Sequence, residues 1–223
     1  MTSRPLVLVP VNLLDRAKGR LSSTFTPAQR RELAIITLRT VVEAAHGTGC
    51  PVTILSADES LAGLELPATI DPEVPGIRGL SPQLEHWLQA HHALDEVLIL
   101  HADLPLATSA AIRALIDSAS CAPSATAIQS ADGGTNAMLL RPAAGMALAY
   151  GPNSFALHRL AAAAAGYAFA EHHSDPLRLD LDTPGDVTRL FATKAGRATV
   201  AGRYLRSLSP SHGRHESGEG AGG

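Results

Sequence analysis

"EVLILHADLPL", residues 96–106, joins a short apolar run to an acid that ends it. Residues 97–100 are all aliphatic, which is typical of a strand buried on both faces of a sheet. Asp103 follows within a few residues, and Pro105 prevents regular strand pairing beyond it. The acid is either the last solvated residue before a turn or a side chain directed at a ligand.

The rest of the chain alternates similar apolar runs with helical patterns. The runs that predict strands are 5–11, 51–58, 68–74, 97–100, 124–132, 135–142 and the alternating segment 177–183. The patterns that predict helices are 26–46, 81–94, 108–119, 154–165 and a last helix from Pro184. Strand and helix in alternation indicate an α/β fold, a single mostly parallel sheet with helices on both faces.

Ligands bind to such sheets in the crevice beyond the carboxyl ends of the strands. Asp103 and Asp58 each follow an apolar strand at that end. We therefore expect Asp58 to contribute to nucleotide binding, and Asp103 to lie in the same site.

Composition excludes several classes of partner. Hydrophobic residues make up 45% of the 223 residues, which predicts one substantial domain, residues 1–208, before a Gly/Ser-rich tail, 209–223, that we expect to be disordered. The formal net charge of −3 gives no basic field for a nucleic acid polymer, and 4% aromatic residues give few stacking platforms.

The two cysteines, Cys50 and Cys121, have no metal-ligand spacing and are expected to be reduced thiols. The apolar run near the N-terminus is too short for a signal peptide, and no stretch approaches the roughly 18 apolar residues of a membrane span. These features predict a cytoplasmic protein without a membrane partner. A homodimer is compatible with the sequence, although no pattern sets the oligomeric state.

Two further acids accompany Asp103. Asp180 and Asp182 alternate in "LRLDLDTP", so on a strand they would share one side. Carboxylates about 4 Å apart repel each other by roughly 4 kcal/mol at an effective dielectric constant of 20, so a convergent set needs protons or cations. Oxygen ligands suit Mg²⁺, which is commonly bound by one or two carboxylates and by substrate phosphates. The alternative is an exposed edge strand with a polar face.

Two cations follow the first predicted strand in "DRAKGRL", residues 15–21. If this loop is extended, Lys18 and Arg20 point the same way, as binding of a triphosphate requires; if it is helical, they diverge. The segment lacks the glycines of a Walker A loop or of a GxGxxG fingerprint. Two solvated charges are the alternative.

Two glycine-containing turns, "GGTN" (133–136) and "GPNSF" (151–155), are candidate anion sites. Ser154 begins a predicted helix, whose free N–H groups favour anions, although it could act only as a helix cap. Of the ten histidines, none shows a zinc-binding pattern, and only His101 and His158 remain candidates for positions near the site.

Five segments occur here in one order: "VPVNLLDRAKGRLSSTFTPAQRRELA", "LHADLPL", "GGTNAMLLRP", "YGPNSFALH" and "LDLDTPGDV". Together they resemble the 2-phospho-L-lactate guanylyltransferase family, which includes phosphoenolpyruvate and 3-phosphoglycerate guanylyltransferases of coenzyme F-420 biosynthesis. The resemblance covers residues 5 to about 190. It implies the nucleotide-diphospho-sugar transferase type of α/β fold.

The resemblance also implies roles for individual residues. Asp103, Asp180 and Asp182 would hold the divalent metals, two Mg²⁺ ions. Lys18 and Arg20 would neutralise the phosphates of GTP as catalytic residues beside Asp103. The phosphorylated carboxylic acid would be bound by Thr135, Gly151 and Ser154.

The implied reaction is transfer of GMP from GTP to that acid, with release of pyrophosphate. Two positions depart from the family pattern: Asn12 stands where Lys is usual, and Ser81 where Asn is usual. Two alternatives are a nucleotidyltransferase of the same fold acting on molybdopterin or a sugar phosphate, and a non-catalytic nucleotide-binding protein. A Rossmann oxidoreductase is disfavoured by the missing glycine fingerprint.

Overall fold

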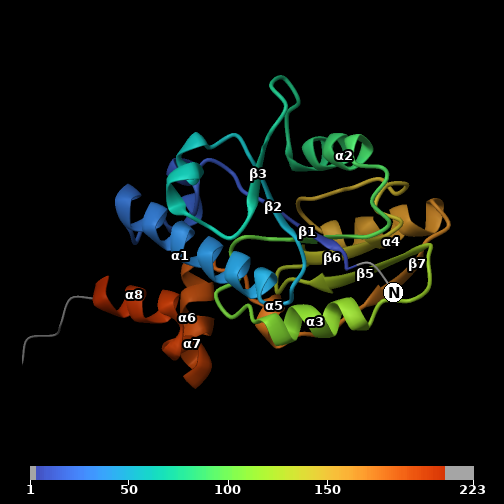
Figure 1. The fold of residues 1–223 in the computed structure, drawn as a ribbon. Helices are drawn as coiled ribbons and strands as arrows, with labels where there is room; N and C mark the ends of the chain where they lie inside the picture. The colour runs from blue at the N-terminus through green and yellow to red at the C-terminus, as the bar shows by residue number, and fades with distance from the viewer. Residues whose placement is uncertain (1–3, 209–223) are drawn as a thin grey trace, which may run out of the picture.

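A computed structural model describes residues 4–208, in which one sheet has helices against both faces (Figure 1). In spatial order the sheet runs β3-β2-β1-β4-β6-β5-β7. The strands are β1 (Leu6–Pro10), β2 (Val52–Ser56), β3 (Thr69–Pro72), β4 (Val97–Leu100), β5 (Ser124–Gln129), β6 (Thr135–Arg141) and β7 (Ala168–Glu171). Every neighbouring pair is parallel except the two that include β6, which confirms the mostly parallel sheet.

The α-helices are α1 (Pro27–His46), α2 (Leu80–Ala90), α3 (Ser109–Asp117), α4 (Ser154–Ala164), α5 (Asp175–Arg178), α6 (Pro184–Ala192), α7 (Lys194–Ala198) and α8 (Val200–Leu208). The described chain also has three 3₁₀ turns: η1 (Leu14–Arg16) and η2 (Gly19–Leu21) lie between β1 and α1, and η3 (Glu59–Leu64) lies between β2 and β3. Thr26 and Thr108 cap α1 and α3 through their side chains. α2 ends at Ala90, before the predicted end at residue 94. At the next residue, the His91 ring stacks on Trp87 and forms a hydrogen bond with its carbonyl oxygen.

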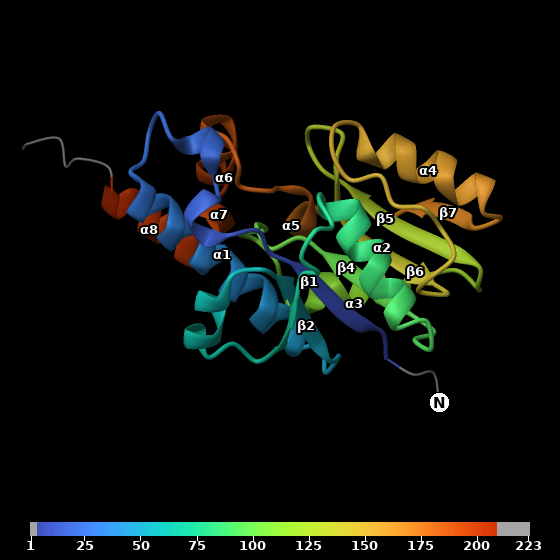
Figure 2. The same ribbon diagram turned by 90° about the horizontal axis from the view of Figure 1, so that it is seen from above.

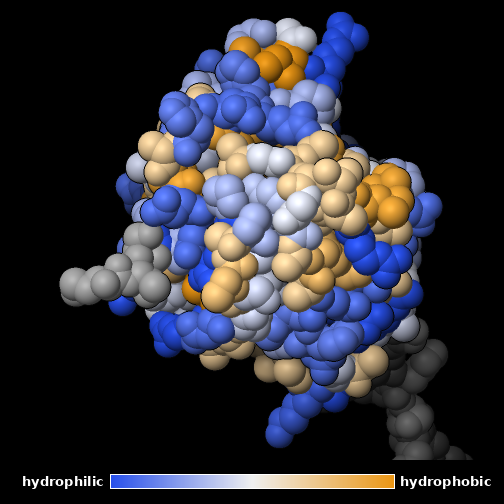
Figure 3. All heavy atoms as spheres, turned by 90° about the vertical axis from the view of Figure 1, so that its right-hand side faces the viewer, coloured by the Kyte–Doolittle hydropathy of each residue, from blue (hydrophilic) through white to orange (hydrophobic). Residues whose placement is uncertain are grey.

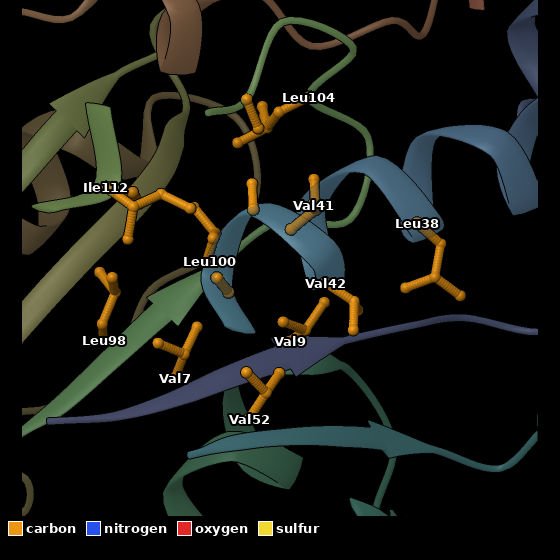
Figure 4. Packing of buried hydrophobic residues seen from close by; sticks show 14 of the residues in the cluster. Val7, Val9, Leu38, Val41, Val42, Val52, Leu98, Leu100, Leu104 and Ile112 are labelled. Atoms are coloured by element: carbon orange, nitrogen blue, oxygen red, sulfur yellow. The ribbon is translucent and has the colours of Figure 1, made fainter. Parts of the chain in front are cut away.

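Alternation along the strands divides the core into two layers. Val7 and Val9 of β1 pack in the layer that contains α1 and α3, whereas Leu8 packs in the layer of α2 and α4. Figures 1 and 2 show these helix pairs on opposite faces of the sheet. In Figure 4, Val41 and Val42 of α1 lie over the β1 and β4 side chains. Because both faces are covered, the strands read as continuous apolar runs.

A third, smaller cluster ties the C-terminal helices to the loop after β1. Leu21 and Leu181 are fully buried there with Leu190 of α6, Leu205 of α8 and Leu33 of α1. Two segments far apart in the sequence, near residues 20 and 181, are thereby fixed side by side. This cluster lies beyond the carboxyl end of the sheet and positions the charged residues described below.

The predicted strand at 177–183 is wrong. Its first residues belong to α5, which Pro176 helps to start, and the remainder has no ladder partner in the described residues. The edge position is taken by β7, which pairs in parallel with β5 and which sequence patterning did not predict. The alternation of Leu and Asp therefore does not arise from the pleat of a strand.

The last predicted helix, which begins at Pro184, is also not one element, since α7 and α8 follow α6.

Large apolar side chains are exposed on β3, at the start of α8 and, one turn apart, on α4. They are Ile70, Leu157, Leu160 and Val200. Figure 3 shows one face, on which polar and apolar residues are interspersed. Within residues 4–208 no helix combines the length and apolarity needed to cross a bilayer. The predicted tail, 209–223, lies outside the described residues.

Candidate active site

A cavity of about 650 Å³ opens beyond the carboxyl ends of β1 and β4. Its walls include the loop after β1, with Asn12, Lys18 and Arg20, and the residues that follow β4, His101 and Asp103. Its volume is in the range of small-ligand sites, roughly 300–1,000 Å³. The position agrees with the sequence-based expectation for a sheet of this type.

Lys18 lies at the centre of the charged part of this cavity. Its Nζ is 3.0 Å from Asp103 Oδ2 and 3.9 Å from Asp182 Oδ1, and its side chain is only 5% exposed. Arg20 approaches the same acid, with Nη1 3.7 Å from Asp182 Oδ2. The two cations converge on Asp182 although the loop is not extended.

The backbone at Lys18 explains that convergence. Its φ of 57° and ψ of 35° place it in the left-handed region, and η2 begins at the next residue. A residue with a side chain in this conformation is held at a cost on the order of 1 kcal/mol or more by its surroundings. The left-handed turn directs Lys18 inward toward Asp103, while Arg20 remains largely exposed at the rim.

The charged form of Asp103 is favoured although the side chain is only 27% exposed. Burial by itself would raise the pKa of this carboxyl, but the Lys18 ammonium and its hydrogen bond outweigh that effect, so the pKa is lowered. Its second oxygen, Oδ1, is buried and has no hydrogen-bond partner in the described structure. One half of the carboxylate is therefore uncompensated.

Asp180 shares this acidic corner. Burial, followed by the negative charge of Asp103, raises the pKa of Asp180 to about 6. Three hydrogen bonds hold this segment in place. The Leu181 N–H donates to the Asp103 carbonyl oxygen at 3.0 Å, and Asn136 Nδ2 donates to the carbonyl oxygens of Leu177 and Arg178. Asn136 was not singled out from the sequence, and it replaces the strand ladder that was expected there.

These acids have the donor type that a divalent cation prefers, but the described side chains do not form a complete cation site. The donors are all carboxylate oxygens, one is buried without a partner, and the raised pKa of Asp180 indicates an excess of negative charge. As the side chains stand, no three His, Cys, Asp or Glu residues between 4 and 208 are close enough to hold a metal ion. Lys18 supplies the compensating charge between Asp103 and Asp182.

A second polar cluster lies where β6 meets α4. Thr135 Oγ1 accepts a hydrogen bond from Ser154 Oγ at 3.1 Å and lies 3.0 Å from His158 Nδ1. The Ala149 backbone N–H donates to His158 Nε2 at 2.9 Å, so Nε2 must be unprotonated and the ring proton must reside on Nδ1. Burial, and then the nearby His101, lower the pKa of His158 to about 4, which agrees with a neutral ring.

The hydrogen bonds of this network determine which hydrogen-bonding capacity of the Thr135 hydroxyl remains. Its oxygen accepts from both His158 and Ser154, so its own hydrogen is the remaining donor. Ser154 is the first residue of α4 rather than its cap; the cap position is held by Asn153 in a left-handed conformation. Gly151, with a φ of +135°, opens the turn before it and has no atom near the site of a Cβ.

Three aromatic rings connect the two clusters. The His101 and Tyr150 ring centroids are 5.2 Å apart, and those of Tyr150 and His158 are 4.7 Å apart. His101 lines the cavity and His158 bonds Thr135, so Tyr150 lies between them. Both histidines kept as candidates belong to this region, whereas Tyr150 gave no sequence signal because a single aromatic residue has no pattern.

Asp58 and the two departures from the family pattern, Asn12 and Ser81, form local hydrogen bonds within the protein. Asp58 accepts from the Leu14 N–H at 2.7 Å and caps η3 through Ser60, and it is not among the residues lining the cavity. Its carboxylate thus holds the loop after β1. Asn12 lines the cavity and accepts from the Leu13 N–H. Ser81 accepts from the Tyr150 N–H, joining α2 to the segment before α4.

The model of the family described as "Guanylyl transferase CofC like" matches residues 5–220. The chain belongs to this family. It is 36% identical over 196 residues to the phosphoenolpyruvate guanylyltransferase of Rubrobacter xylanophilus, covering 83% of this chain and 93% of that protein. It is 33% identical to the 2-phospho-L-lactate guanylyltransferase of Methanothermobacter thermautotrophicus, covering 90% and 89%. The resemblance predicted from the five motifs is confirmed.

Solved structures share the fold of this chain. A provisionally described nucleotide-diphospho-sugar transferase of Desulfovibrio desulfuricans G20 matches with a TM-score of 0.73 at 15% identity, covering 92% of this chain and 95% of that one. The 4-diphosphocytidyl-2C-methyl-D-erythritol synthase matches with a TM-score of 0.53 at 15% identity, covering 86% and 100%. At such identities the match shows the fold alone. Nucleotidyltransferases of the CofC-like family typically use a divalent metal ion.

Proposed function

We propose that this guanylyltransferase moves GMP from GTP to phosphoenolpyruvate or 2-phospho-L-lactate, releasing pyrophosphate, as a step of coenzyme F-420 biosynthesis. The observation that carries the proposal is the group formed by Lys18, Asp103 and Asp182 in the wall of the cavity. Paired cations beside uncompensated carboxylates suit a polyanion that arrives with a divalent ion. 3-Phosphoglycerate is the third acceptor of this class.

In the proposed reaction a phosphate oxygen of the acceptor attacks the α-phosphorus of GTP. The new P–O bond forms as the bond from the α-phosphorus to the oxygen bridging the α- and β-phosphates breaks, and pyrophosphate takes the electron pair. The acceptor phosphate is already ionised at neutral pH, so no general base is needed. Lys18 and Arg20 bind and neutralise the triphosphate, and most of the catalysis is positioning and charge compensation.

Asp103, Asp180 and Asp182 are the residues proposed to hold Mg²⁺, two ions in all. Bound there, the metal supplies charge neutralisation at the phosphates. Asp103 Oδ1 would receive the partner that it lacks in the described structure. The ionisation of Asp180, disfavoured by burial and by neighbouring acids, would become favourable beside a cation.

Thr135, Ser154 and Gly151 are proposed to bind the phosphorylated acid. The Thr135 hydroxyl hydrogen is the donor left free by His158 and Ser154. The turn at Gly151 leads into α4, and the dipole at the N-terminus of this helix favours an anion. The ring series from His101 to His158 makes this cluster adjacent to the cavity wall.

The test is pyrophosphate release from GTP and Mg²⁺ with each of the three phospho-acids. Asp103→Asn should abolish release. Asp95→Asn is the matched control, because Asp95 is exposed and precedes the opposite end of the same strand. We expect release with one acid, retained in Asp95→Asn and lost in Asp103→Asn. No release with any acid, despite measurable GTP binding, would refute the proposed reaction.

A further inference from the structure

Three of the seven buried polar side-chain atoms that lack a hydrogen-bond partner in the described structure lie at or beside the cavity. Tyr150 Oη and His101 Nε2 each have less than 1 Å² exposed and no hydrogen-bond partner in the described structure, as does Asp103 Oδ1. An unsatisfied buried polar group costs about 1–3 kcal/mol, so native proteins keep few of them without a functional or solvent partner. Of these three, Asp103 belongs to the proposed metal site, so the roles of Tyr150 and His101 are still to be explained.

The two rings occupy the junction between the halves of the site. His101 follows β4 in the cavity wall, two residues before Asp103. Tyr150 lies against His101 on one side and against His158 on the other, and it directly precedes Gly151. His101 lines the cavity, and Tyr150, which does not line it, joins His101 to the cluster of Thr135 and Ser154 through His158.

Both groups are suited to donate hydrogen bonds rather than to carry charge. Burial raises the pKa of the Tyr150 hydroxyl, so it keeps its proton. His101 Nε2 is likewise buried without a partner among the described residues, beside the Tyr150 ring. A neutral imidazole retains one N–H. Neutral donors in a water-poor setting bind anionic oxygens strongly.

We propose that Tyr150 Oη and His101 Nε2 donate hydrogen bonds to the anionic groups of the phospho-acid and hold its phosphate beside the nucleotide. This inference rests on the proposed function. It adds two substrate-binding residues to Thr135, Gly151 and Ser154, and it accounts for two polar atoms that folding leaves without partners.

Tyr150→Phe is the decisive variant because it removes one oxygen and nothing else. If the hydroxyl serves only the acceptor, the variant folds with unchanged or higher stability, since no existing bond is lost. KM for the phospho-acid should rise about 10- to 100-fold, as expected for a hydrogen bond to a charged group. KM for GTP should remain as in the unsubstituted protein.

Tyr167→Phe is the matched control. Tyr167 is also buried, but its hydroxyl donates to the carbonyl oxygens of Pro142 and Ala144 at 3.2 and 3.0 Å. This variant should lose stability in urea unfolding while KM for the acceptor stays constant. His101→Leu should repeat the effect of Tyr150→Phe, and His101→Gln, which retains an amide donor, should restore part of it.

Turnover and equilibrium binding of phosphoenolpyruvate and 2-phospho-L-lactate in the presence of GTP and Mg²⁺ separate the two proposals. Active unsubstituted protein with unchanged acceptor KM in Tyr150→Phe overturns the inference alone, and a bound water then satisfies the hydroxyl. Acceptor binding that weakens in Tyr150→Phe supports it even if turnover is absent, in which case only the proposed reaction fails. No binding of either acid to the unsubstituted protein overturns both.

Discussion

The two halves of the site differ in how far their polar groups are satisfied. Around Lys18, two carboxylates share one ammonium group and Asp103 retains an unpartnered oxygen. Around Thr135, both nitrogens of His158 and the hydroxyl of Ser154 are hydrogen-bonded. Under the proposed function, the charges of the ligands complete the first half. The hydrogen bonds of the second half are already formed, so its polar groups are ordered during folding and not when a ligand binds.

Removing the central cation should have the largest effect on activity. Lys18→Met keeps the length of the side chain but leaves Asp103 and Asp182 without their shared ammonium group. We expect kcat/KM for GTP to fall by about 100-fold or more, the magnitude typical of a lost electrostatic contact in a transition state. Steady-state pyrophosphate release measures this.

Lys194→Met is the control for that measurement, because Lys194 is the only other lysine in the sequence and is exposed on α7. It should behave as the unsubstituted protein does. If Lys18→Met retains full kcat/KM for GTP, the charged half of the cavity does not bind the triphosphate.

In the preformed half, the expected loss is of stability as well as of binding. His158→Leu removes the acceptor for the Ala149 N–H and the donor to Thr135 in a fully buried position. Each group left unsatisfied costs about 1–3 kcal/mol. We expect the free energy of unfolding in urea to fall by about 2–4 kcal/mol and KM for the acceptor to rise. A fully stable His158→Leu would show that the network is not a structural unit.

The same histidine should make stability depend on pH. The pKa of His158 is about 4 in the folded protein and 6.5 without the fold, so the unfolded chain binds the extra proton between these values. The contribution of neutral His158 to the free energy of unfolding is therefore complete above pH 6.5 and declines as the pH falls to about 4. It amounts to at most roughly 3 kcal/mol.

The comparison for that prediction is His158→Gln, which does not titrate. Urea unfolding at pH 7.5 and 5 should show a larger loss of stability on acidification in the unsubstituted protein than in the variant. Equal losses would mean that the ring is protonated as easily in the fold as outside it.

Much of the site could be predicted from sequence because its parts follow strands. The end of β4 places Asp103 at the crevice whatever the detail of the loops. Asp180 and Asp182 were expected near it on a strand, yet Asn136 and the Leu181 N–H hold their segment instead. Such contacts join residues about 40 or more positions apart, so they cannot be predicted from the periodicity of a local stretch of sequence.

Side-chain networks were the least predictable part. The two glycine-containing turns made Thr135 and Ser154 candidates, and the resemblance gave them a role. The tautomer of His158, however, depends on one backbone N–H, that of Ala149. Tyr150 lies in an irregular segment without periodicity. Asp58, expected at the nucleotide, bonds the loop after β1, because a carboxylate at a strand end can satisfy backbone N–H groups as well as bind a ligand.

The smallest effect is expected at the rim of the charged half. Arg20 has a 68% exposed side chain and lies 3.7 Å from Asp182, so solvent screens the pair. Arg20→Gln should change the free energy of unfolding by less than about 1 kcal/mol. KM for GTP should nevertheless rise several-fold in low salt, since a rim cation attracts an incoming triphosphate over a distance that salt shortens. The difference between Arg20→Gln and unsubstituted protein should therefore shrink as salt is raised to 0.5 M, whereas the Lys18→Met defect should persist, because Lys18 is enclosed by protein and Arg20 is not. If the two variants respond equally to salt, the distinction between a buried cation that holds the triphosphate and an exposed one that attracts it is wrong.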